Sequence, residues 1–142
     1  MKQLVVARAT TLVATVALGL ALASPGTAAG PPHVVIPRIG LDMALSRTLD
    51  GGPTVYFRDW DTLAIAGHRT TWSHPFNRLP ALHRGDVIRV GKRTFRVRRM
   101  TTVRPWETWI VRYHGLVLST CYPAGSDAYR YVVFAKEVAQ AA

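Results

Sequence analysis

Three residues in this sequence could together carry out nucleophilic chemistry, and the first is its single cysteine. Cys121 ends the strand-like apolar segment 116–120. A thiolate is reactive when it is partly exposed and lies near positive charge. A cysteine at the end of a strand fits that description, whereas an inert buried thiol is the alternative reading. The segment by itself leaves both readings open.

His68 follows Gly67 at the end of the apolar run 63–66. An imidazole can polarise a thiol, and an imidazolium can give a proton to a leaving amine. The other four histidines are candidates on chemistry alone, although two of them lie in expected turns: His33, His74, His83 and His114.

Arg130 opens the apolar run 131–135, one turn after Cys121. A chain that turns between these two runs returns antiparallel, so the guanidinium can lie beside the thiol. Its fixed charge and its fork of donors suit a peptide carbonyl or a developing oxyanion. We therefore predict that Cys121, His68 and Arg130 form one catalytic site.

A metal centre is the competing use of these side chains. His68 and His74 could bind zinc together with Cys121, but one cysteine without a closely spaced ligand pair is a weak zinc pattern. No cluster of acidic residues indicates calcium either. We expect no metal and no cofactor.

The predicted site residues must be positioned by short apolar runs, which are separated by turn residues. A hairpin with a glycine-containing turn is expected at 86–98, and a short helical turn at 76–82. Such a pattern is typical of an all-β barrel or sandwich. The expected strands are 33–36, 63–66, 86–90, 94–98, 116–120 and 131–135.

Composition limits the remaining possibilities. The 142 residues allow one domain, and 49% hydrophobic residues supply a core. The formal charge of +10 favours contact with polyanions, but the arginines are scattered, as on a solvated basic surface. No basic and aromatic signature of nucleic-acid binding is present.

The N-terminal segment 1–32 has the pattern of an export signal or membrane anchor with a linker, followed by a folded domain at 33–142. Lys2 and Arg8 precede the uncharged run 9–23, and small residues follow. That run is shorter than the about 20 residues of a free-standing membrane span, so cleavage and retention both stay open. We expect an extracytoplasmic protein at the cell surface.

In three segments the sequence resembles a known family, the sortases. The segments 64–69 (Ala-Ile-Ala-Gly-His-Arg), 116–121 (Leu-Val-Leu-Ser-Thr-Cys) and 129–130 (Tyr-Arg) are similar to its three signature segments. The resemblance covers roughly residues 34–138, and His-Arg-Thr-Thr at 68–71 resembles class E.

The resemblance implies an eight-stranded β-barrel that cleaves a sorting signal of LPxTG or LAxTG type. Cys121 would attack the threonine carbonyl and form a thioacyl enzyme, and His68 would protonate the departing glycine amine. Arg130 would bind the signal and support the oxyanion, while Thr120 would contact the substrate. An amino group of a peptidoglycan precursor would then resolve the intermediate.

Parts of the chain depart from the family pattern. Residues 51–57 replace a longer stretch, and the segment 106–115 is short for a loop that lines the signal groove. Trp106 and Trp109 are expected to pack against the barrel rather than to line this groove. A thiol hydrolase using the same three residues, and a non-catalytic basic β-domain that binds wall polymer, stay as alternatives.

Overall fold

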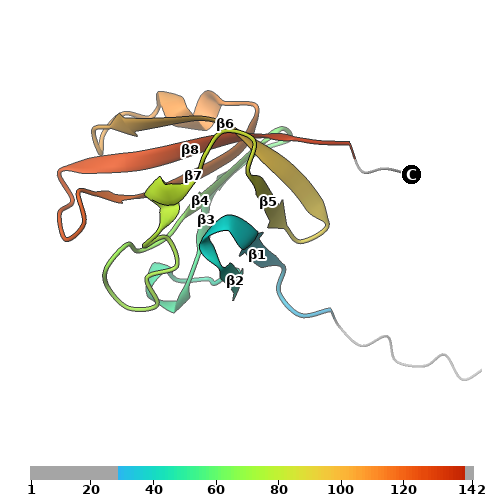
Figure 1. The fold of residues 1–142 in the computed structure, drawn as a ribbon, viewed down its shortest axis with the longest axis horizontal. Helices are drawn as coiled ribbons and strands as arrows, with labels where there is room; N and C mark the ends of the chain where they lie inside the picture. The colour runs from blue at the N-terminus through green and yellow to red at the C-terminus, as the bar shows by residue number, and fades with distance from the viewer. Residues whose placement is uncertain (1–28, 140–142) are drawn as a thin grey trace, which may run out of the picture.

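The computed structural model describes residues 29–139, so the predicted export segment falls almost entirely outside the described residues. Eight strands form a single sheet in the order β2-β1-β5-β6-β8-β7-β4-β3 (Figure 1). The strands are β1 (His33–Ile36), β2 (Leu41–Ala44), β3 (Thr54–Arg58), β4 (Thr62–Ala66), β5 (Val87–Val90), β6 (Arg93–Val103), β7 (Gly115–Tyr122) and β8 (Tyr129–Glu137). Four short 3-10 helices join them: η1 (Pro37–Ile39), η2 (Leu49–Gly51), η3 (Leu79–Ala81) and η4 (Trp109–Arg112).

The sheet curls until its two edge strands meet. Ser46, just after β2, forms a parallel bridge with Thr54 at the start of β3. The Ser46 N–H donates to the Pro53 carbonyl at 2.8 Å. The predicted all-β, eight-stranded barrel is thereby confirmed.

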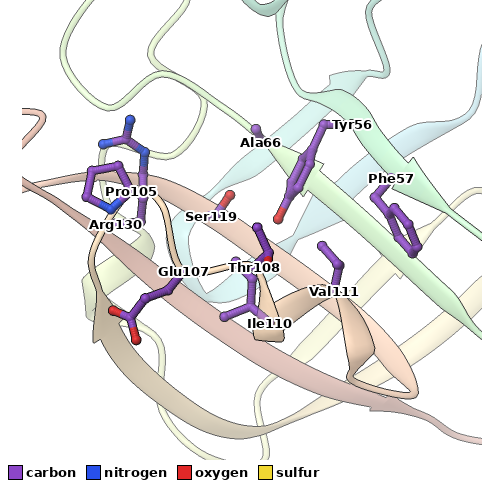
Figure 2. Close-up of a pocket in the computed structure, with 10 residues that line it drawn as sticks. All are labelled: Tyr56, Phe57, Ala66, Pro105, Glu107, Thr108, Ile110, Val111, Ser119 and Arg130. Carbon is purple, nitrogen blue, oxygen red and sulfur yellow. The ribbon is translucent and has the colours of Figure 1, made fainter.

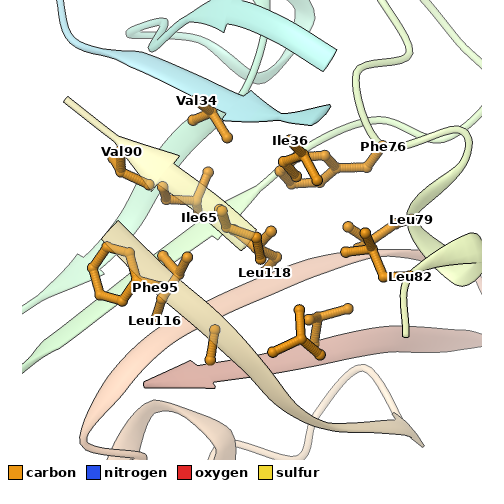
Figure 3. Packing of buried hydrophobic residues seen from close by; sticks show 14 of the residues in the cluster. Val34, Ile36, Ile65, Phe76, Leu79, Leu82, Val90, Phe95, Leu116 and Leu118 are labelled. Atoms are coloured by element: carbon orange, nitrogen blue, oxygen red, sulfur yellow. The ribbon is translucent and has the colours of Figure 1, made fainter. Parts of the chain in front are cut away.

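Strand β7 is buried on both faces, which explains its rigidity. Because side chains alternate across a strand, Leu116 and Leu118 face the main core, where Ile65 and Phe95 also lie (Figure 3). Val117 points the other way into a second cluster with Phe134. Burial of each such side chain stabilises the fold by about 1.5–3 kcal/mol. The strand that carries Cys121 near its end is therefore held firmly in place.

The strands predicted from the apolar runs are all present, and the predicted hairpin at 86–98 is formed by β5 and β6. Strand β6 continues to Val103, well beyond the predicted end, because it pairs with β8 along its length. The predicted helical turn at 76–82 is a single 3-10 turn, η3. Strands β2 and β3 were not predicted, since their side chains are only partly buried and do not alternate cleanly.

No helix among residues 29–139 combines the length and the apolar character that a bilayer crossing requires.

Candidate active site

The ends of β4 and β7 bring His68 and Cys121 to the same edge of the sheet. These two strands are parallel neighbours, and their last registered pair is Ala66 with Ser119. Two residues beyond this pair, the segment after β4 reaches His68, and β7 reaches Cys121. Both residues line one pocket. The sequence places them far apart, and the parallel pairing joins them.

Arg130 comes to the thiol from the other side. Strand β8 pairs antiparallel with β7, and the register sets Arg130 directly opposite Cys121. Arg130 Nη1 donates to the carbonyls of Asp127 at 2.9 Å and Tyr129 at 3.1 Å, which fixes the direction of the guanidinium. The predicted antiparallel return of the chain after Cys121 is confirmed.

Hydrogen bonds hold the Gly67-His68 segment against β7. The Gly67 N–H donates to the Ser119 carbonyl at 3.1 Å. In turn, the Thr120 hydroxyl donates to the Gly67 carbonyl at 2.8 Å. Thr120 is only 3% exposed, so in this structure its side chain fastens the histidine segment. The substrate contact predicted for Thr120 stays a prediction.

Gly67 is required at this position by close packing. A Cβ added there would lie 2.6 Å from Cδ2 of Phe76, which is fully buried. The Phe76 N–H also donates to the His68 carbonyl at 3.1 Å. A larger residue would clash with Phe76 and Pro75, so the chain next to His68 or these side chains would have to shift.

Asp50 contacts the imidazole and is a site residue that the sequence analysis missed. Its Oδ1 lies 2.8 Å from His68 Nε2, and it comes from the 3-10 helix η2 between β2 and β3. Asp50 is 62% exposed at the side chain, whereas His68 is 20% exposed. The carboxylate accepts a hydrogen bond from Nε2–H and holds one ring orientation. No local pattern marks Asp50, because only the fold brings η2 to His68.

The pocket at the thiol has a volume of about 480 Å³, and most of the residues that line it are polar. Arg69 and Asp127 lie in it with His68 and Cys121, and neither of these two was a sequence candidate. Its walls come from the segment after β4 and from the turn between β7 and β8, which lie at the same end of the molecule (Figure 1).

A second, more apolar pocket of about 380 Å³ is lined by residues of β3, β7, β8 and the η4 region (Figure 2). Ser119 lines it, while Cys121, on the same face of β7, lines the polar pocket. Tyr56 reaches in from β3, and burial raises the pKa of its phenol while a hydrogen bond with Ser119 opposes the rise. The loop before η4 and Arg130 complete the wall.

Glu107 organises the loop that forms one wall of the apolar pocket. Its carboxylate accepts hydrogen bonds from the Arg104 N–H at 2.6 Å and from the Trp109 indole N–H at 3.2 Å. The Arg104 bond, more than the Trp109 bond, lowers the pKa of Glu107. The carboxylate is therefore used to fix the loop.

The two tryptophans of this loop lie outside the apolar pocket lining. Trp109 stacks on Phe134 with ring centroids 5.8 Å apart, as the packing prediction requires. The same prediction is wrong for Trp106, which is 69% exposed beneath the Arg104 guanidinium.

Of the five histidines, His68 lines the pocket that holds Cys121, and His33, His83 and His114 have other partners: Asp42, Arg38 and Asp61, respectively. Over residues 29–139, no group of three or more His, Cys, Asp or Glu side chains is arranged to hold a metal ion.

Comparison with solved structures gives close likeness of fold. Sortase C-1 from Actinomyces oris matches with 27% identity and a TM-score of 0.69, over 77% of this chain and 74% of that one. Sortase A from Corynebacterium diphtheriae, in a lid mutant, matches with 20% identity and a TM-score of 0.69, over 78% of this chain and 71% of that one. Sortase E1 from Streptomyces coelicolor, solved with a tripeptide in the active site, matches with 20% identity and a TM-score of 0.66, over 78% and 88% of the two chains.

A search of curated proteins gave no match. The family model described as "Sortase domain" matches residues 34–138, which is most of the chain and agrees with the sequence resemblance. The barrel and its structural relatives agree with this match. The chain therefore belongs to the sortase family, a family of transpeptidases.

Proposed function

We propose that this protein is a cysteine transpeptidase that cleaves a sorting signal after threonine and transfers the acyl group to an amine. The observation that carries the proposal is the meeting of three chain segments at one strand end. Cys121 and His68 share a pocket, and Arg130 stands opposite Cys121 in the β7–β8 register.

In this mechanism the Cys121 thiolate attacks the threonine carbonyl of the bound signal. The tetrahedral oxyanion is stabilised by the Arg130 guanidinium, whose other contacts are main-chain carbonyls that hold it in place. His68 gives its proton to the departing glycine amine, and the thioacyl enzyme remains. An incoming amine then forms the new amide bond and releases the thiol.

The signal peptide would lie in the apolar pocket, with its scissile carbonyl directed towards Cys121. A Leu-Pro or Leu-Ala dipeptide suits a pocket lined by Phe57, Ile110 and Val111. We propose that the signal is of LPxTG type, or of the LAxTG type that the resemblance to class E implies.

The natural acceptor would be an amine of a peptidoglycan precursor, and the substrates would be exported proteins at the cell surface. We propose that residues 1–32 direct export, either as a cleaved signal or as a retained anchor, and that residues 33–142 form the catalytic domain. The basic surface that the charge of +10 implies would face an anionic wall.

The test is incubation of the protein with LPxTG and LAxTG peptides, with and without an amine. An acyl adduct on Cys121, seen by mass spectrometry, and a new amide product are expected. Acylation followed only by hydrolysis would identify a thiol hydrolase. If a folded protein forms no adduct with either peptide, the sorting-signal assignment fails. Salt-sensitive polymer binding that survives Cys121→Ala would then favour the non-catalytic reading.

A further inference from the structure

Arg69 is a second arginine at the thiol, and its hydrogen-bonding capacity is largely unused. Its Nη1 is the one buried side-chain polar atom without a hydrogen-bond partner within residues 29–139. Its Nε donates only weakly, to the Asn77 carbonyl at 3.4 Å. A buried charged donor without a partner is unfavourable, so this guanidinium has donor capacity that an acceptor would satisfy.

Stacking does not satisfy this guanidinium. Its Cζ lies 5.4 Å from the centroid of the Tyr122 ring, which occupies one face of the planar group. The N–H bonds lie in the plane of a guanidinium, so stacking on the ring does not supply them with an acceptor, whereas a carboxylate would.

The same pocket also holds a carboxylate. Asp127 lies in the turn between β7 and β8 and lines the pocket with Arg69 and Cys121. The pocket thus offers a cation and an anion beside the thiol. A zwitterion with its ammonium and its carboxylate close together has the complementary charges.

The position of the pocket at Cys121 suits the second substrate of the proposed reaction, the acceptor amine. The apolar pocket begins at Ser119, and the polar pocket lies further along the same face of β7, at Cys121. A signal bound in the first would leave the second open once its glycine side has departed. An acceptor must approach the thioester from there.

We propose that this polar pocket is the acceptor site and that it selects an α-amino carboxylate, with Arg69 binding the carboxylate and Asp127 attracting the ammonium group. This inference rests on the proposed transpeptidase function. The ammonium group first loses one proton to solvent, and the amine nitrogen then attacks the thioester carbonyl, so that the N–C bond forms and the C–S bond breaks. The second amine proton passes through His68 to the Cys121 thiolate, which regenerates thiol and neutral imidazole.

The test compares glycine with glycinamide as acceptors for the peptide-acylated enzyme. The measured quantity is the ratio of the two kcat/KM values for amide formation, within each variant. Arg69→Met is expected to lower the glycine preference about 10-fold or more, because a charge-assisted hydrogen bond is lost. Arg69→Lys keeps the charge and should keep most of the preference. Asp127→Asn should slow both amines and leave the ratio unchanged, because both carry an ammonium group.

Arg99→Met is the matched control. Arg99 also stacks on an aromatic ring, with its Cζ 4.7 Å from the Phe134 centroid, but it does not line the pocket. The glycine preference should survive this change. If Arg69→Met leaves the ratio at the wild-type value, or Arg99→Met lowers it equally, the acceptor proposal is overturned.

A binding experiment separates this proposal from the proposed function. Glycine and glycinamide are titrated into Cys121→Ala protein and followed by NMR at the Tyr122 ring signals, which are present with and without Arg69. The acceptor site is supported if glycine binds more tightly than glycinamide and this difference disappears in the double variant that also carries Arg69→Met. This result stands even if neither sorting peptide acylates the enzyme. Equal binding of the two amines would count against the acceptor site even if acylation succeeds.

Discussion

Arg130 lies directly opposite Cys121 in the antiparallel β7–β8 ladder. This pairing makes the closeness of the two backbones a property of the sheet itself. Side chains that face each other across a β-ladder are neighbours on one face of the sheet. The guanidinium is fixed further by two main-chain carbonyls.

Replacement of Cys121 by alanine should abolish acyl-enzyme formation. Removal of a nucleophile lowers turnover by more than about a thousandfold, because no other group can form the covalent intermediate. Mass spectrometry after incubation with peptide measures the adduct. An adduct of equal yield in Cys121→Ala would contradict the assignment of the nucleophile.

Arg130→Lys should lower kcat/KM for acylation by about 100-fold, as loss of an oxyanion donor does. Lysine keeps the charge but lacks the planar fork that the two carbonyls orient. Arg104→Lys is the control, since Arg104 stacks on the exposed Trp106. Equal rates in wild type and Arg130→Lys would show that charge alone suffices.

Asp50→Asn should lower kcat about two- to fivefold with little change in KM. The effect is small because Asp50 is 62% exposed and an exposed ion pair contributes about 0–1 kcal/mol. Asp42→Asn is a matched control, because Asp42 forms a similar pair with His33, 2.6 Å apart and also exposed. If both variants slow the enzyme alike, Asp50 has no specific effect on His68.

Thr120→Val should destabilise the fold by about 1–3 kcal/mol, since the buried Gly67 carbonyl loses its donor while the side-chain shape is kept. Denaturant unfolding followed by fluorescence measures the change. Thr102→Val is the control, because Thr102 is exposed on β6. A stability loss equal to that of the control would mean that water replaces the hydroxyl.

Glu107→Gln should reduce stability at neutral pH, and the difference from wild type should shrink in acid. The folded-state pKa of Glu107 is lowered, so its stabilising effect is complete above the unfolded-state pKa and is lost as the pH falls through the folded-state pKa. Thermal unfolding of both proteins across this range measures the difference. A gap that is independent of pH would exclude the carboxylate hydrogen bonds as its cause.

The sequence by itself determined the all-β class and the principal strands, and it predicts Cys121, His68 and Arg130 as the site residues. Apolar runs ended by turn residues predict strands, and the site residues stand at the ends of those runs, where side chains are both fixed and accessible. The antiparallel return from Cys121 to Arg130 needs only one short turn, so it can be predicted from the local sequence.

Only the tertiary structure decided which further groups reach the thiol. The parallel β4–β7 pairing sets His68 beside Cys121. The curl of the sheet also carries Asp50 from η2 to the imidazole. Arg69 and Asp127 share a pocket although they belong to different loops. These contacts join segments distant in sequence, and no local periodicity encodes them, because they arise when the whole barrel closes around its core.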